Sequence, residues 1–215
     1  TVYVNVAQAG SVGDVACDAA DILRYTPAGQ WQLFFDGSDV GLGVAGIKAF
    51  TLLSDNSILL SVAKPVDVAG LGRIGLEDVL RFIPTSTGTT TAGTFQLYFD
   101  GSDVSLTAKS EAIDALTIGP GGKLIISTTG KVTIKPPSGN LKARNSDLLA
   151  FTFGTTGSST SGTWSLYFEG ADVGLKKENV DALWIDPLNG DIYLSVTNAY
   201  NLGNGVSGDE SAIFI

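Results

Sequence analysis

The sequence predicts an all-β fold made of three tandem repeats of four strands each, with an orphan strand at each end of the chain. Two observations lead to this prediction. The 215 residues include 27 glycines and only 16% charged residues, a composition typical of strands joined by tight turns. In addition, four short apolar segments recur three times in the same order along the chain.

The second strand of the repeat is the easiest to recognise. It opens a motif at 31–42, 95–106 and 164–175, which reads WQLFFDGSDVGL, FQLYFDGSDVSL and WSLYFEGADVGL. Apolar residues such as Trp31 and Leu33 stand two positions apart, so they share one face of a strand.

The other three strands keep fixed positions around this motif. The first lies at 21–25, 78–82 and 147–151, the third at 47–53, 113–119 and 180–186, and the fourth at 58–62, 124–128 and 192–196. The fourth is almost continuously apolar, which is typical of a strand covered on both faces. Turn-forming residues join the third to the fourth as a hairpin. The repeats therefore span about 21–62, 78–128 and 147–196 of a single domain, 1–215.

The ends of the chain predict two strands without a complete repeat. Residues 2–6 (VYVNV) match a fourth strand, and residues 210–215 (ESAIFI) match the first strand at 77–82. An orphan strand exposes unpaired backbone groups and needs a partner. That partner lies either within the chain, closing a ring, or in a neighbouring copy. A propeller-like and a β-prism-like arrangement both fit, and the question of closure stays open.

The repeat unit, LYFDGSDVGL followed by IDAL and IYLSV, resembles a tandem β-strand repeat of large exported bacterial and archaeal proteins of unassigned function. The resemblance covers essentially the whole chain and implies an exported β-repeat module, without catalytic residues to transfer. The first repeat departs from the pattern, because Lys48 stands where the others carry Asp114 and Asp181. The chain contains no Met, which a removed secretion signal explains, so we expect an extracellular or cell-surface location.

Composition also excludes several classes of function. The chain has no His, the commonest general base and metal ligand, and a single Cys, so a zinc cluster or an intrachain disulfide is excluded. The net charge of −9 argues against nucleic acid as a partner. No run of about 18 apolar residues predicts a membrane span. We assign no catalytic and no cofactor-binding residues, and we expect a protein that is not an enzyme.

An acidic pair follows the second strand in every repeat and is the candidate metal site. The pairs are Asp36 with Asp39, Asp100 with Asp103, and Glu169 with Asp172. Calcium binds carboxylate and carbonyl oxygens, so these pairs are possible calcium ligands. The alternative is that the carboxylates cap a tight turn through hydrogen bonds to its backbone.

Other carboxylates and one aromatic residue leave further alternatives open. Asp21, Asp78 and Asp147 begin the first strands, where they either form a turn or point inward as ligands for a sugar or an ion. Together with Asp114 and Asp181 they supply enough carboxylates for a glycosidase pair. Trp184 stands where the other repeats carry aliphatic residues, about Leu52 and Ile118, which hints at a surface contact.

These observations support three hypotheses. The first is a non-enzymatic extracellular structural or surface subunit, whose copies assemble head to tail into a filament or layer through their terminal strands. The alternatives are a carbohydrate-binding, lectin-like module and a glycoside hydrolase that uses the repeated carboxylates. We also expect the Ser/Thr-rich hairpins at 85–94 and 154–163 to project outward.

Overall fold

Each complete sheet of the protein takes its strands from two successive repeats. The computed structural model describes residues 1–135, 140–203 and 205–215. The first complete sheet has the order β11-β10-β7-β6, and the second has the order β12-β13-β16-β17, with all neighbours antiparallel. Their strands are β6 (Ile47–Leu52), β7 (Ile58–Val62), β10 (Val79–Ser86), β11 (Ala92–Phe99), β12 (Ile113–Ile118), β13 (Leu124–Thr128), β16 (Leu148–Thr155) and β17 (Ser161–Phe168). The all-β prediction is confirmed, and each sheet joins the third and fourth strands of one repeat to the first and second of the next.

Two partial sheets lie at the ends of the chain. The N-terminal sheet has the order β1-β4-β5, built from β1 (Val2–Asn5), β4 (Ile22–Tyr25) and β5 (Trp31–Phe35). It therefore lacks the strand that corresponds to β6 and β12. The C-terminal sheet pairs β18 (Val180–Ile185) with β19 (Ile192–Val196). The segment 210–215, predicted as an orphan strand, forms a single antiparallel bridge, between Phe214 and Leu194 of β19.

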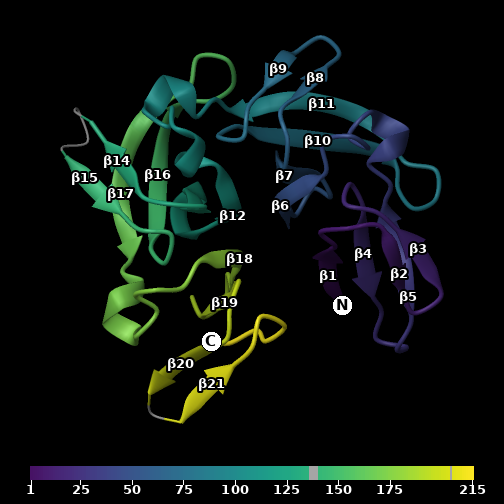
Figure 1. Ribbon diagram of the computed structural model, residues 1–215. Coiled ribbons are helices and arrows are strands. Elements are labelled where there is room, and N and C mark those ends of the chain that lie inside the picture. Colours follow the sequence, from purple (N-terminus) through teal and green to yellow (C-terminus); the bar gives the residue numbers. More distant parts are fainter. Residues whose placement is uncertain (136–139, 204) are drawn as a thin grey trace.

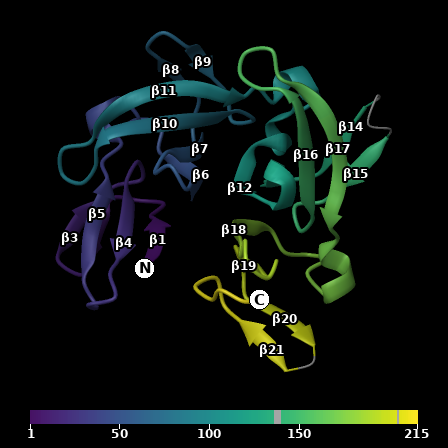
Figure 2. The same cartoon turned by 180° about the vertical axis from the view of Figure 1, so that it is seen from behind.

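The sheets are arranged like the blades of a propeller around an open ring (Figures 1 and 2). The strands β6, β12 and β18 are the innermost of their sheets, and β12 packs against both of the others. The hydroxyls of Thr51 on β6 and Thr117 on β12 lie 3.4 Å apart. The ring is open between the C-terminal sheet and β1 (Figure 1).

The hydrophobic cores lie between neighbouring sheets, which explains the apolar fourth strands. On β7, Leu59 faces the core shared with the second complete sheet, whereas Ile58 and Leu60 face the core shared with the N-terminal sheet. All five residues of β7 and of β13 are buried, so the predicted coverage of both faces is confirmed. Edge-to-face aromatic pairs link successive repeats in these cores, as between Phe35 and Phe82 with ring centroids 5.1 Å apart.

Each link from a fourth strand to the following segment forms a small hairpin, which the sequence pattern does not indicate. These hairpins are β2 (Gly10–Val12) with β3 (Val15–Cys17), β8 (Val66–Val68) with β9 (Gly72–Ile74), β14 (Val132–Ile134) with β15 (Leu141–Ala143), and β20 (Tyr200–Gly203) with β21 (Val206–Gly208). Helical structure in the described ranges is confined to 3₁₀ turns: η1 (Ser38–Val40), η2 (Ser102–Val104), η3 (Lys109–Glu111), η4 (Pro120–Gly122) and η5 (Gly170–Val173). None of these is long enough to span a membrane.

Candidate functional site

The acidic pairs of the first two repeats hold the hairpin of the next repeat in place. The Asp39 carboxylate accepts a hydrogen bond from the backbone N–H of Thr91 at 2.8 Å, and Asp103 accepts one from Thr160 at 2.9 Å. The hydroxyls of the same threonines accept hydrogen bonds from the backbone N–H groups of Asp36 and Asp100, both at 2.9 Å. We call each of these two arrangements a clasp.

In the clasps, carboxylate oxygens of the candidate calcium ligands Asp39 and Asp103 already accept hydrogen bonds from the protein backbone. Asp36 and Asp100 also accept hydrogen bonds from the N–H groups of Ser38 and Ser102, two residues further on, so they cap the turns as the alternative interpretation held. Among the residues whose positions are described, no three acidic, His or Cys side chains gather as a metal-binding group. Thr91 and Thr160 are buried, so the Ser/Thr-rich hairpins dock on the preceding repeat, and the expectation that they project outward is wrong at these residues.

The third acidic pair differs from the other two. Glu169 precedes η5 and Asp172 lies within it, where the backbone N–H of Asp172 donates to the Glu169 carbonyl at 3.1 Å. In the described part of the chain, no hairpin forms a clasp with their carboxylates. The structure therefore gives the three predicted pairs unequal roles.

The aspartates that begin the first strands form buried turns. Asp78 accepts hydrogen bonds from the N–H groups of Gly75 at 2.7 Å and Gly101 at 3.1 Å, and burial raises the pKa of its carboxyl to about 6. Asp21 and Asp147 make the equivalent pairs of bonds. A Cβ on Gly101 would lie 2.3 Å from the Glu77 carbonyl oxygen, so only glycine fits there. These aspartates belong to the scaffold, as the turn interpretation held.

The second residue of each inner strand is a β-bulge residue near the centre of the ring. Lys48, Asp114 and Asp181 stand where the register shifts by one position. Asp114 is fully buried and accepts a hydrogen bond from the side-chain amide of Asn179 at 2.8 Å. Burial raises the pKa of its carboxyl to about 7, against the opposing effect of Lys48. Asp181 accepts a hydrogen bond from the Ser195 hydroxyl at 2.8 Å.

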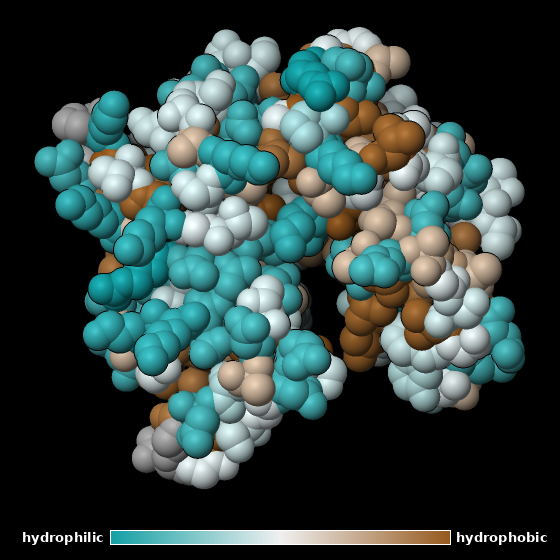
Figure 3. Space-filling view, viewed as in Figure 1, coloured by the Kyte–Doolittle hydropathy of each residue, from teal (hydrophilic) through white to brown (hydrophobic). Residues whose placement is uncertain are grey.

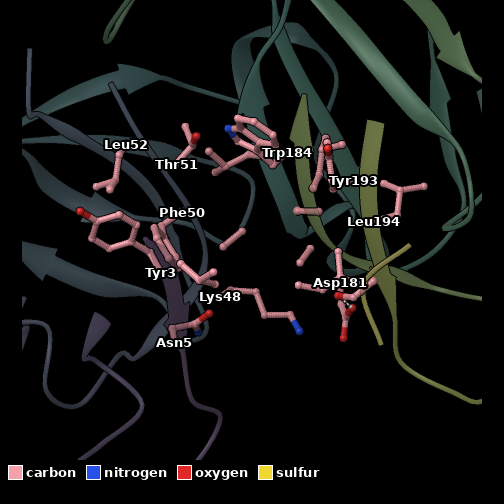
Figure 4. A pocket seen from close by; sticks show the side chains of 18 of the residues that line it. Tyr3, Asn5, Lys48, Phe50, Thr51, Leu52, Asp181, Trp184, Tyr193 and Leu194 are labelled. Atoms are coloured by element: carbon pink, nitrogen blue, oxygen red, sulfur yellow. Dashed lines mark hydrogen bonds between the residues drawn. The ribbon is translucent and has the colours of Figure 1, made fainter. Parts of the chain in front are cut away.

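A pocket of about 510 Å³ lies at the opening of the ring, beside β1. It is lined by residues 1–3 and 5, 48–52, 181–184 and 193–195, with Ala115, Leu116 and Ile213; we call it the β1 groove. Figure 4 shows Tyr3, Phe50 and Lys48 on one side of the groove, and Trp184, Tyr193 and Asp181 on the other. Apolar side chains line the wall of the opening in the space-filling view (Figure 3).

Two of the candidate residues, Asp181 and Trp184, line the β1 groove. The aromatic one is Trp184. Its side chain is 46% exposed and packs against the Tyr193 ring, with centroids 5.1 Å apart. The strand register shows that the counterparts of Trp184 are Thr51 and Thr117, and not Leu52 and Ile118 as the sequence suggested. Trp184 pairs with Tyr193, the second residue of β19. Thr51 and Thr117 pair with the second residues of β7 and β13, Leu59 and Ile125. A lone tryptophan therefore replaces a buried threonine of the other inner strands.

Comparison with known proteins does not assign this chain to a family. A scan against protein-family models and a search of curated proteins each find no match to this chain.

Proposed function

We propose that this protein is a non-enzymatic structural subunit of the cell exterior, which joins neighbouring polypeptides into a filament or layer by strand complementation. Copies of the chain would join head to tail through their terminal strands. The low charge content and the repeat architecture support an exported structural module. The observation that carries the proposal is the open edge of β1.

In the described sheets, β1 pairs only with β4, whereas its counterparts β7 and β13 have a partner on both edges. Val2 on β1 is 48% exposed, while the corresponding Ile58 and Leu124 are fully buried. An unpaired strand edge beside an exposed apolar side chain favours pairing with another chain. The β1 groove is the place where such pairing would occur.

The positions of the carboxylates favour a structural role over hydrolysis. A glycosidase pair needs two carboxyl groups that flank a bound sugar. Asp114 is fully buried, and Asp21, Asp78 and Asp147 are held by backbone N–H groups in turns. Among the described acidic residues, Asp181 alone lines the β1 groove.

The test is the assembly state of purified variants. Deleting residues 1–7 is expected to abolish assembly, because it removes β1. Since that deletion could also unfold the N-terminal sheet, the second variant is Trp184→Ser, which alters the groove without removing a strand. Leu188→Ser is its matched control, because Leu188 is 93% exposed and lies outside the groove. Assembly that is insensitive to both the deletion and Trp184→Ser would overturn the proposal.

A second candidate function is the binding of carbohydrate. Trp184 and Tyr193 form an aromatic surface in the β1 groove, with Tyr3 across from it (Figure 4). Such surfaces stack against the apolar faces of sugars. Titration with neutral oligosaccharides, followed by tryptophan fluorescence, tests this candidate. A response that Trp184→Ser abolishes would support it, and the absence of any response would reject it.

A further inference from the structure

We propose that the outward face of the β14–β15 hairpin binds an anionic polysaccharide through a group of lysine and arginine side chains. We call this surface the basic face, and it consists of Lys131, Thr133, Lys135, Lys142 and Arg144. It lies at the outer edge of the ring, away from the β1 groove (Figure 1). The inference adds a ligand to the proposed function and rests on the extracellular location that this function assumes.

The alternation of residues along the hairpin separates a buried side from the basic face. The inward residues, such as Val132 and Ala143, are buried in a hydrophobic core, and β15 packs against β17. The residues of the basic face take the alternate positions and are all exposed. The buried side therefore holds the basic face in a fixed position on the molecule.

The positive charges of the basic face are not neutralised by the protein itself. In the described part of the chain, neither of the two ion pairs involves this face, and residues 115–146 include no Asp or Glu. Asp147 is buried and accepts the backbone N–H of Arg144 at 2.8 Å. Glu111 is buried too and accepts the backbone N–H of Ala108 at 2.7 Å. Both carboxylates thus face backbone groups, and the cations face solvent.

A fifth cation lies next to the basic face. The Ser110 hydroxyl donates to the Lys131 carbonyl at 3.3 Å, so the exposed Lys109 of η3 is close to the start of β14. Five of the 13 basic residues of the chain therefore surround one hairpin, although the net charge is −9. Charges more than about 8 Å away are largely screened at physiological ionic strength, so the acidic remainder of the chain does not cancel this local field.

The equivalent hairpins show that the repeat architecture does not require this charge. In β8–β9 the central outward pair is Asp67 and Arg73, which form an ion pair at 3.1 Å. In β14–β15 the corresponding pair is Thr133 and Lys142, so the carboxylate is missing and the ammonium has no counterion. In β2–β3 the position holds Ser11 opposite an alanine. The basic face is therefore a feature of one hairpin alone among these three.

The strand register also brings like charges together. Continuing the pairing of β14 and β15 by one residue places Lys131 opposite Arg144. Like charges directly opposite each other destabilise an antiparallel pair. An anionic group bound between the two side chains removes this repulsion, which favours binding.

The residue types of the basic face favour a polysaccharide over a nucleic acid or a protein. The face carries no aromatic side chain on which a base would stack, and no exposed apolar anchor of the kind that protein interfaces use. Lysine is also depleted in protein interfaces, whereas clusters of Lys and Arg are typical of surfaces that bind acidic polysaccharides. The Thr133 hydroxyl lies between the cations and can hydrogen-bond to sugar hydroxyls. A polymer with an anionic group on each repeating unit presents several anions to this face at once.

The test measures binding of the full chain to alginate, which carries carboxylates, and to dextran sulfate, with uncharged dextran as the negative control. Fluorescence anisotropy of the labelled polymers gives the affinity, and acetylation followed by mass spectrometry identifies the lysines that the polymer covers. We expect protection of Lys131, Lys135 and Lys142, and no protection of the exposed Lys64 in the link before β8. Raising the salt concentration to about 0.5 M should weaken binding strongly.

Two variants and one control test the basic face directly. Thr133→Asp places a carboxylate opposite Lys142, as Asp67 lies opposite Arg73, and is expected to weaken binding about threefold to tenfold. Replacing Lys131 and Lys142 together by Gln should weaken it about tenfold or more. Ser11→Asp is the matched control, because it makes the same change of charge at the equivalent exposed position of β2–β3, on the opposite side of the ring (Figure 1). Its affinity should stay within about twofold of the wild type.

Several outcomes would overturn the inference. They are the absence of binding to both anionic polymers at low ionic strength, equal binding of uncharged dextran, and equal weakening by Ser11→Asp and Thr133→Asp. Equal affinity for polyglutamate or duplex DNA would also overturn it, because the face would then not select a polysaccharide. Unchanged melting temperatures of the variants show that a loss of binding does not come from unfolding.

The failure of this inference can be distinguished from the failure of the proposed function. Assembly into filaments by a protein that binds neither polymer would contradict the polysaccharide site and leave the proposed function intact. Polymer binding by a protein that never assembles would support the site and contradict the proposed function.

Discussion

The carboxylate of Asp103 accepts a hydrogen bond from the backbone N–H of Thr160, 57 residues further along the chain, at 2.9 Å. This contact joins the turn after β11 to the hairpin of β16 and β17, and Asp39 makes the same contact with Thr91. The acidic motif that recurs in the sequence therefore fastens one blade to the next. Its recurrence reflects a requirement of the repeat architecture.

Replacing Asp103 by Ala is expected to lower the free energy of unfolding by about 1–2 kcal/mol, because the buried Thr160 loses its acceptor. The matched control is Asp172→Ala at the equivalent position of the third repeat, for which we expect a change within about 0.5 kcal/mol. Urea denaturation measures both. Equal losses in the two variants would contradict the clasp.

Calcium at millimolar concentration is expected to leave the melting temperature unchanged, since hydrogen-bond donors already engage the carboxylates of both clasps. Calorimetry with and without a chelator measures this. The opposite result would be a rise in melting temperature with calcium that the Asp103→Ala variant does not show. It would establish that the acidic pairs bind calcium in addition to forming the clasps.

Replacing Gly101 by Ala is expected to destabilise the fold by about 1–3 kcal/mol or more, because the new Cβ would overlap the Glu77 carbonyl. The shift would also weaken the hydrogen bond from Gly101 to the buried Asp78. Gly10→Ala serves as the control, since a Cβ there meets no atom within 4 Å. Thermal and urea unfolding should separate the two variants clearly, and equal stabilities would refute the argument.

The buried Asp114 predicts greater stability in acid. Its pKa is raised from 3.8 to about 7, so the folded protein binds this proton more tightly than the unfolded chain does. The stabilisation is fully present below the unfolded pKa and is lost as pH rises through about 7. Each unit of pKa corresponds to about 1.4 kcal/mol, so the loss amounts to a few kcal/mol.

Asp114→Asn is therefore expected to be more stable than the wild type at about pH 8 and to have a flatter profile. A residual fall between about pH 4 and 6 should remain in this variant, because Asp78 has a pKa raised to about 6. Asp14→Asn, at the exposed turn between β2 and β3, is the control and should retain the wild-type slope, because Asp14 does not contribute to the raised pKa of Asp114. A wild type that gains stability between about pH 4 and 8 would contradict this account.

Strand positions could be predicted from the sequence because alternation and apolar runs are local signals. Trp31, Leu33 and the buried run from Ile58 to Leu60 illustrate this. Sheet membership could not be predicted, because the partner of a strand depends on long-range register. β7 and β13 each have one neighbour from their own repeat and one from the next.

The candidate site was predictable only in part. Thr91 and Thr160 were missed, although each stands three residues after a glycine in its hairpin, at Gly88 and Gly157. Asn5 was missed because its role depends on a carbonyl 42 residues away. The orphan strand at 2–6 was predicted correctly, since it matches a fourth strand residue by residue.

The central claim is that the open edge of β1 joins this protein to its neighbours. Negative-stain microscopy of the purified chain, combined with its mass in solution, tests this claim most directly. The account predicts regular filaments or layers that disappear when residues 1–7 are deleted. Discrete monomers at every concentration, with and without the deletion, would contradict it.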